Sequence, residues 1–405
     1  MGGRGGHRAA RVTHAAPPLH GTRAEHSFRA VSAPPPDPAV RHLLVDARTL
    51  VRNRRGTGRY TRALLVAMVR ERPALRCTLL ARDAKDVAPL REQLASLDGV
   101  AARSTVIAAR AAGGVDCDAA WYPTNFVLHR PRSGAIVPTI HDLYPMLLLD
   151  GRWWKVLKRT RARLRYARTV ALADRIVTGA EASAAEIART FGVPRERIAV
   201  VPHAADDFAA ADPACADALL ARLGVAGPFL LAVGSQEPRK NLPVLYEAMR
   251  RLAAAGRTIP LVLCGPRGVH GLDEGDAAPP WLRVAGFVDD ATLAALYARA
   301  TALVFPSYYE GFGLPVLEAL AVGGTVIASD ASTLPEVGGD AVLYFPPRDA
   351  DALAACVTRL LDDPALAASL RARAPLQAAR FSWARSARGT LAALDAGVAA
   401  HRARR

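Results

Sequence analysis

The segment Leu303–Asp330 constrains the fold of this chain more than any other stretch of its sequence. It opens with a short apolar run of strand type, Leu303–Phe305, and closes with a second one, Thr325–Ala328. Between them, a glycine-containing loop precedes a helical pattern that starts at Pro315 and ends at Gly323–Gly324. The order strand, loop, helix, strand predicts a βαβ unit, with the loop at the edge of the sheet where α/β proteins bind ligands.

Two glutamates flank this loop. Glu310 and Glu318 would lie about 12 Å apart along one continuous helix, which is too far for one small site. With Glu310 in the loop and Glu318 in the first helical turn, both can face one ligand. The glycines of Gly311–Leu314 let backbone N–H groups approach that ligand, and the helix N-terminus favours a diphosphate. The carboxylates would then bind sugar or ribose hydroxyls; the alternative is an ordinary βαβ unit with surface glutamates.

Length and composition limit the classes of protein to consider. The 405 residues suggest two or three domains, and the formal charge of +16 favours an anionic partner, although high arginine usage explains part of it. Five scattered cysteines without a CxxC pattern indicate reduced thiols of a cytosolic protein and no zinc site. We expect residues 1–40 to be a disordered basic tail, since they contain no apolar segment of a secretion signal.

A second glycine turn opens the folded part of the chain. His42–Asp46 reads as a strand, and Gly56 and Gly58 form a turn before an amphipathic helix at Arg59–Arg70. This order predicts a ligand-facing loop, although any βα turn can contain glycine. The nearby Asp116-Cys117-Asp118 pattern stands at the entry to a strand, so we interpret its aspartates as solvated turn residues and not as metal ligands.

Polar residues also follow two other predicted strands. The apolar run Ala135–Leu143 contains His141 near its end, which predicts either a ligand contact in the crevice or a hydrogen-bonded strand-end histidine. Gly234 follows the strand Phe229–Val233 and leads to Arg239-Lys240. This cationic pair would stabilise the charge of a departing diphosphate. The alternative is a surface pair next to a helix N-cap.

Residues 151–168 contain eight lysines or arginines together with Trp153 and Trp154. This composition is typical of a basic helix that lies on an anionic membrane surface, and equally of a solvated basic face packed by its tryptophans. No nucleic-acid recognition motif accompanies the charge, so nucleic acid is not an expected partner.

Taken together, the segments VDART, GTGRYT, TIHDLYP, EPRKNL and YYEGFGLP resemble the retaining GT-B glycosyltransferases of family 4 over residues 42–385. In particular, they resemble bacterial mannosyltransferases of surface-polysaccharide and lipopolysaccharide assembly. The resemblance implies two doubly wound Rossmann-like domains facing across a cleft. Its boundaries would be 41–204 for the acceptor-side domain, 205–226 for a linker, 227–385 for the nucleotide-sugar domain and 386–405 for a terminal helix and tail, frayed at its end.

The resemblance also implies roles. The catalytic residues would be His141, Arg239, Lys240 and Glu310. The donor-binding residues would be Gly56, Gly58, Gly234, Phe287, Val288, Gly311, Phe312, Gly313, Leu314 and Glu318. We expect metal-independent transfer of a sugar, mannose from GDP-mannose first, to a hydroxyl of a glycan or polyprenyl-diphosphate-linked acceptor at the cytoplasmic face of the membrane.

Two departures from the family pattern stand out. Ala204 replaces the glycine of the interdomain VPNGVD segment, and Thr325 replaces a proline after the second glutamate's helix. Two other functions remain open: a GT-B-fold epimerase or phosphorylase, and a non-catalytic nucleotide-sugar-binding protein associated with membranes.

Overall fold

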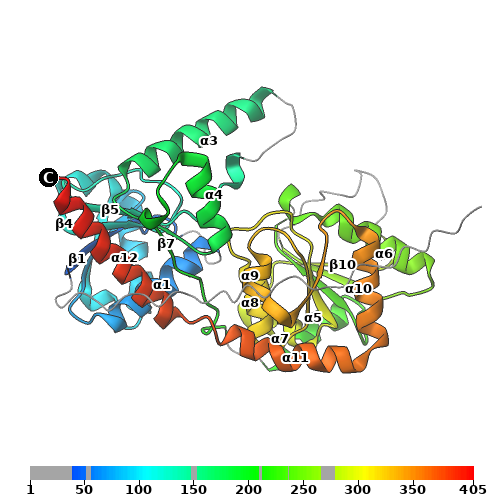
Figure 1. The fold of residues 1–405 in the computed structure, drawn as a ribbon. Helices are drawn as coiled ribbons and strands as arrows, with labels where there is room; N and C mark the ends of the chain where they lie inside the picture. The colour runs from blue at the N-terminus through cyan, green and yellow to red at the C-terminus, as the bar shows by residue number, and fades with distance from the viewer. Residues whose placement is uncertain (1–38, 52–55, 147–152, 209–211, 236, 266–278) are drawn as a thin grey trace, which may run out of the picture. The chain divides into compact units, whose positions relative to one another are not determined.

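The computed structural model describes residues 39–51, 56–146, 153–208, 212–235, 237–265 and 279–405. These residues belong to one compact unit, Pro34–Arg405, which contains two separate parallel sheets with their covering helices (Figure 1). Most of the predicted tail, 1–40, lies outside the described residues. Val40 is already buried, and its N–H donates to Asp395 at 3.0 Å.

The first sheet has the strand order β3-β2-β1-β4-β5, and a short pair, β6-β7, continues it through a bridge between Thr139 and Val177. All of its strand pairs are parallel. Its strands are apolar because helices cover both faces of such a sheet. Their bounds are β1 His42–Val45, β2 Arg76–Ala81, β3 Ser104–Ala108, β4 Asp116–Tyr122, β5 Ser133–Pro138, β6 Ile176–Thr178 and β7 Ile198–Val200.

We call this sheet and its helices the first lobe. Its helices are α1 Thr57–Glu71, α2 Val87–Ala95, α3 Trp153–Leu172, α4 Glu181–Phe191 and the last helix of the chain, α12 Trp383–Ala403. Helix α12 packs against α1 and β5 (red in Figure 1), so the chain returns to its first lobe after completing the second.

The second lobe is built on the strand order β10-β9-β8-β11-β12-β13, again with parallel pairs. The order reverses between β8 and β11, and such a reversal opens a crevice at the carboxyl ends of the strands. The strands are β8 Leu230–Val233, β9 Leu261–Cys264, β10 Leu282–Gly286, β11 Ala302–Phe305, β12 Val326–Ser329 and β13 Val342–Phe345. The helices are α5 Asp217–Arg222, α6 Leu242–Ala254, α7 Asp290–Arg299, α8 Leu314–Ala321, α9 Leu334–Gly338, α10 Ala350–Asp362 and α11 Pro364–Ala378.

The βαβ unit predicted around Leu303–Asp330 is confirmed as β11, α8 and β12. Helix α8 ends at Ala321, and Gly323 behind it has φ +74°, in the left-handed region. Gly324 allows close packing, because a Cβ there would lie 2.7 Å from the carbonyl oxygen of Tyr297. Thr325, at the position where relatives carry proline, is buried, and its carbonyl accepts the N–H of Leu303 at 2.8 Å.

Three expectations differ from the structure. The strand predicted to run to Leu143 ends at Pro138. Within the predicted linker 205–226, the segment 213–222 is helical, and Leu219 and Leu220 are buried in the core. The terminal residues, expected to fray, continue α12 to Ala403, since His401 and Arg404 both bind the buried carboxylate of Asp174.

Candidate active site

The loop between β11 and α8 needs both of its glycines for close packing. Gly313 has φ +106°, in the left-handed region, and a Cβ there would lie 2.7 Å from Leu334. A Cβ on Gly311 would lie 2.4 Å from the carbonyl oxygen of His141 in the first lobe. The sequence predicted glycines for a ligand's approach; in the structure the first lobe's backbone makes the close approach to Gly311.

Glu310 joins the predicted cationic pair to this loop. Its side chain is only 7% exposed, and its Oε1 accepts from Lys240 Nζ at 2.7 Å. Its Oε2 accepts from Arg239 Nη1, also at 2.7 Å. Arg239 donates in addition to Glu237 at 2.6 Å and lies 5.4 Å above the ring of Tyr144. Arg239 and Lys240 therefore meet the glycine loop at the carboxylate of Glu310, the convergence that the sequence predicts.

Burial and charge oppose each other within this cluster. Burial disfavours the charged form of Glu310, but Lys240 and Arg239 outweigh it, so its pKa lies below the usual value. Burial lowers the pKa of Lys240, and Glu310 compensates only in part. For Arg239, the attraction of Glu310 and Glu237 exceeds the cost of burial and raises the pKa. The cluster is a largely buried network of ion pairs in which two cations face two carboxylates.

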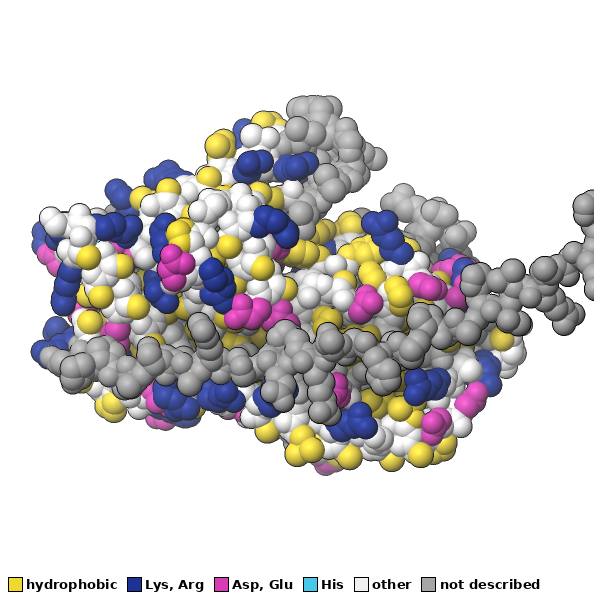
Figure 2. Space-filling model, viewed as in Figure 1, with side chains coloured by type: hydrophobic (Ala, Val, Ile, Leu, Met, Phe, Trp, Pro, Cys, Tyr) yellow, Lys and Arg dark blue, Asp and Glu magenta, His cyan; other side chains and the backbone are white. Residues whose placement is uncertain are grey.

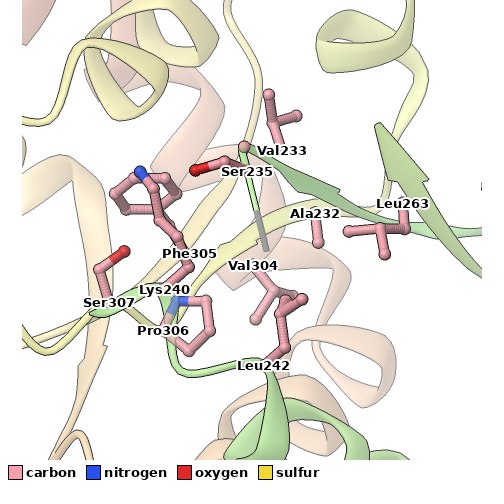
Figure 3. A pocket seen from close by; sticks show the side chains of 11 residues that line it. Ala232, Val233, Ser235, Lys240, Leu242, Leu263, Val304, Phe305, Pro306 and Ser307 are labelled. Atoms are coloured by element: carbon pink, nitrogen blue, oxygen red, sulfur yellow. The ribbon is translucent and has the colours of Figure 1, made fainter. Parts of the chain in front are cut away.

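A small cleft, with room for about one water molecule and partly open to solvent, lies beside Lys240 at the carboxyl ends of β8, β9 and β11 (Figure 3). Gly234 begins its rim with φ +137°, and a Cβ there would lie 3.2 Å from Lys240 Cε. Ser307 lines the same cleft and is fully buried. The cleft lies where the strand order reverses, which is the expected place for a ligand.

Glu318 lies in a different setting. It is the fifth residue of α8, beyond the first turn predicted for it, and is 8% exposed. Its Oε1 accepts from Arg59 Nη1 of the first lobe at 2.5 Å, and its Oε2 from Tyr297 at 3.1 Å. Gly56, with φ +56°, precedes α1, and Gly58 lies in the first turn. Arg59 follows Gly58 in the same turn, and donor binding by the two glycines stays a prediction.

His141 is held as a hydrogen-bonded core histidine. Its Nε2 contacts the carbonyl oxygen of Pro123 at 2.8 Å, and its ring lies 4.8 Å from Tyr60 and 5.2 Å from His203. Burial lowers its pKa against the opposing effects of Pro123 and Asp142, which keeps the ring neutral at neutral pH. These contacts favour the second of the two interpretations made from the sequence, and a donor contact stays a prediction.

The remaining donor-binding candidates divide by exposure. The ring of Phe312 is buried against His203 at 4.7 Å and Phe381 at 5.8 Å. Val288 is buried and Leu314 packs against the core, so these residues can offer only backbone groups to a ligand. Phe287, by contrast, is 71% exposed.

Sequence reasoning missed several residues that join the two lobes at this loop. The hydroxyl of Tyr309 donates to Glu186 at 2.5 Å and accepts the N–H of Leu143 at 2.9 Å. Asp142, which the sequence places with His141 at the crevice, lies near this loop; burial raises its pKa against the opposing effects of the Tyr144 N–H and Arg239. For Tyr309 the signal in the sequence was position alone, because it precedes Glu310.

Helix α4 makes two more of these contacts. The residue type and position of Ser183 predict a helix N-cap, but Ser183 lies inside α4, and its hydroxyl donates to the Gly311 carbonyl at 3.3 Å. The preceding Ala180 has no side chain that could cap the helix. Instead, the carboxylate of Glu336 in the second lobe accepts the N–H groups of Glu181 at 2.8 Å and Ala182 at 2.7 Å.

The DxD pattern is used structurally. Asp116 pairs with Arg132, and Asp118 accepts the backbone N–H groups of Arg41 and His42 at 2.8 Å. Across the described ranges, no group of three or more His, Cys, Asp or Glu side chains is placed to hold a metal ion.

Helix α3 carries much of the first lobe's positive charge. Figure 2 shows Lys and Arg side chains over α3 and the neighbouring part of this face. We call the following set the α3 basic face; its members are all exposed: Lys158, Arg159, Arg161, Arg163, Arg165 and Arg168. Leu157 and Leu164 are exposed beside it. Among the helices as far as the structure describes them, none combines the length and apolarity needed to cross a membrane.

Solved structures share this architecture. The chain matches sucrose-phosphate synthase from Thermosynechococcus elongatus with a TM-score of 0.63 and 18% identity, over 86% of this chain and 96% of that one. It matches WaaG, a glycosyltransferase involved in lipopolysaccharide biosynthesis, with a TM-score of 0.62 and 14% identity, over 86% and 98%. At such identities the likeness shows the fold, which is the predicted GT-B fold.

Sequence relatives and family models agree with the fold. O-antigen chain mannosyltransferase B of Escherichia coli is 38% identical over 216 residues, 51% of this chain and 57% of that protein. The serotype-specific mannosyltransferase WbdA of Escherichia coli is 31% identical over 61% of this chain and 32% of its own length. The matches thus span from a third to just over half of these relatives. Residues 223–377 match the model for glycosyl transferases group 1, and residues 4–207 match that for Glycosyltransferase Family 4. The chain therefore belongs to glycosyltransferase family 4.

Proposed function

We propose that this protein transfers a sugar from a nucleoside-diphosphate sugar to a hydroxyl of its acceptor. The observation that carries the proposal is the convergence of Lys240 and Arg239 on Glu310, each at 2.7 Å, beside the cleft at the reversal of strand order. A buried lysine and a half-buried arginine suit a diphosphate, and a carboxylate between them suits the hydroxyls of the attached sugar.

Both cations can serve two partners at once. A lysine has three N–H donors and an arginine has five, whereas Glu310 uses one of each. The phosphate oxygens of the nucleotide sugar would accept the remaining N–H groups of the two cations. Glu310 would keep its ion pairs and accept from the hydroxyls of the sugar. The positive charge then acts where negative charge grows as the diphosphate departs.

We propose that the transfer retains the anomeric configuration. The acceptor oxygen bonds to the anomeric carbon on the face that the diphosphate leaves. The bond from that carbon to the phosphate oxygen breaks, and the acceptor's proton passes to the leaving oxygen. Arg239 and Lys240 supply the charge stabilisation in this scheme, so no metal ion is required.

Mannose from GDP-mannose is the donor that we favour, because relatives of this chain are named mannosyltransferases. The proposed acceptor is a glycan or polyprenyl-diphosphate-linked sugar. The test supplies radiolabelled GDP-mannose, UDP-glucose and dTDP-rhamnose in parallel with a membrane extract. We expect label from GDP-mannose on the acceptor together with free GDP. Transfer from UDP-glucose or dTDP-rhamnose instead would mean that mannose is not the donor sugar. Isomerisation of the sugar without transfer would favour an epimerase.

We also propose that the α3 basic face brings the enzyme to anionic membranes, where a lipid-linked acceptor resides. The six exposed cations with Leu157 and Leu164 have the mixed character of an interfacial helix. Reversing Arg159, Arg161 and Arg163 to glutamate should abolish sedimentation with vesicles containing phosphatidylglycerol. The control reverses three exposed cations elsewhere, Arg82, Lys85 and Arg359. Equal loss in both variants would show that net charge, and not this helix, controls binding.

A further inference from the structure

Arg59 occupies a position that is electrostatically unfavourable for a cation. It lies in the first turn of α1, near the positive end of the helix dipole, and its side chain is 8% exposed. The first turn of α1 contains no acidic residue that could offset this charge. A buried cation at a helix N-terminus needs compensation from elsewhere in the fold, and residues that break a local rule in this way often have a functional role.

The compensating carboxylates are Asp207, in the segment that leaves the first lobe, and Glu318 of the second lobe. Arg59 Nη1 donates to Glu318 Oε1 at 2.5 Å, and Nη2 donates to Asp207 Oδ1 at 2.8 Å. The guanidinium also lies 4.8 Å above the ring of Phe208. Attraction to Glu318 and Asp207 outweighs the effect of burial and raises the pKa of Arg59, so the cation is permanent.

The same cluster holds both connections between the lobes. Asp207 belongs to the segment that leaves the first lobe, and its Oδ1 also accepts from the indole Nε1 of Trp383 at 2.7 Å. Trp383 begins α12, where the chain returns to the first lobe, and its backbone N–H donates to Asp206 at 3.0 Å. Arg59 thus ties Glu318 directly to the outgoing segment and, through Asp207, to the returning one.

We propose that Arg59 is a positioning residue that fixes Glu318 for the donor's ribose and links ribose binding to the relative placement of the lobes. The inference rests on the proposed function and on the expectation from the sequence that Glu318 binds sugar or ribose hydroxyls of the donor. Arg59 Nη1 holds Glu318 Oε1 at 2.5 Å, and its planar guanidinium fixes the direction of that carboxylate.

The test measures ribose recognition separately from stability. Isothermal titration calorimetry compares GDP and UDP, each with its 2′,3′-dideoxy form, on the full chain. We expect the wild type to bind the ribose form about tenfold more tightly, as for one charge-assisted hydrogen bond. Arg59→Met should bind both forms equally within about twofold, with affinity for the dideoxy form unchanged. A purely structural role would weaken both forms together or neither.

Arg72→Met is the matched control. Arg72 lies at the other end of α1 and pairs with Asp395 of α12 at 2.6 Å, so the variant also loses a partly buried ion pair next to α12. It should keep the full ribose preference. If Arg59→Met does not fold, Arg59→Lys decides, because a lysine keeps the charge but cannot hold both carboxylates with a planar fork; it should lose at least half of the preference.

Three results would overturn the inference, and they differ in which other proposals they reject. If both Arg59 variants keep the wild-type preference for the ribose form of the nucleotide, only the positioning role of Arg59 is rejected. A wild type that binds ribose and dideoxy forms equally also rejects the ribose role of Glu318, while transfer from a nucleoside-diphosphate sugar stands. A wild type that binds none of the four nucleotides rejects the proposed function together with the inference.

Discussion

Glu310 and Glu318 are two buried carboxylates, each in contact with an arginine, but the cations that stabilise them belong to different lobes. Glu310 is bound by Arg239 and Lys240, which belong to its own lobe. Glu318 is bound by Arg59, which belongs to the other lobe. The first site can therefore form within the second lobe alone, whereas the second depends on how the lobes meet.

The difference suggests a division of labour. A cation pair that one lobe assembles can be preorganised for the proposed diphosphate before the lobes meet, so that less ordering is needed during the reaction. Glu318, whose partner Arg59 lies in the other lobe, changes its environment whenever the lobes move relative to each other. We expect the Glu310 site to control the chemical step and the Glu318 site to report on lobe placement.

Neutralising each glutamate tests the comparison with the largest expected effect. Glu310→Gln leaves Arg239 and Lys240 side by side without their carboxylate and should lower the unfolding free energy by about 3–5 kcal/mol. Glu318→Gln leaves Arg59 paired with Asp207 and should cost no more than about 2 kcal/mol. Denaturant unfolding with matched slopes gives both values; equal losses would remove the distinction between the two sites.

Removing one cation tests the chemical role of the first site. Lys240→Ala should lower turnover more than a hundredfold, about 2.7 kcal/mol in the barrier, because the charge on the departing diphosphate loses a buried cation. Steady-state transfer assays measure the effect, with circular dichroism as a check of the fold. Lys85→Ala, at an exposed lysine, is the control. A turnover near that of the control would remove Lys240 from the phosphate site.

Acid should erase the stabilisation at Glu310. The pKa of this carboxyl lies below its ordinary value of 4.5, so the unfolded chain takes up its proton first as the pH falls. The stabilisation is therefore complete above about pH 4.5 and declines below it, by at most about 1.4 kcal/mol per pH unit. The difference in unfolding free energy between wild type and Glu310→Gln should stay nearly constant from pH 7 to pH 5 and narrow by less than about 1 kcal/mol at pH 4. A gap that narrows already between pH 7 and 5 would point to another titrating group.

The sequence predicted the first of these sites better than the second. Arg239 and Lys240 follow β8, and Glu310 follows β11; these strands are neighbours, and the carboxyl ends of parallel strands meet at one edge. The Arg59–Glu318 contact joins residues 259 positions apart in different lobes, and no local pattern encodes such a pairing. The first turn of α1 nevertheless held a signal, a cation where a helix disfavours one.

The departure at α4 has a physical cause of the same kind. Ser183 has the residue type of a helix cap, but it lies inside the helix, and a glutamate of the other lobe accepts the first N–H groups. A contact distant in sequence replaces the local rule there.

The smallest effect that we predict tests how firmly α4 joins the lobes. Glu336→Gln keeps the size of the side chain but removes the charge that accepts the N–H groups of Glu181 and Ala182, and it should cost about 1 kcal/mol of stability. Because α4 also contacts the glycine loop through Ser183, turnover should fall a few-fold while nucleotide affinity stays unchanged. Asp363→Asn, which weakens the cap of α11 within the second lobe, is the matched control and should lower stability without changing turnover. Loss of turnover in the control as well would mean that helix stability in general, and not the joint between lobes, limits the reaction.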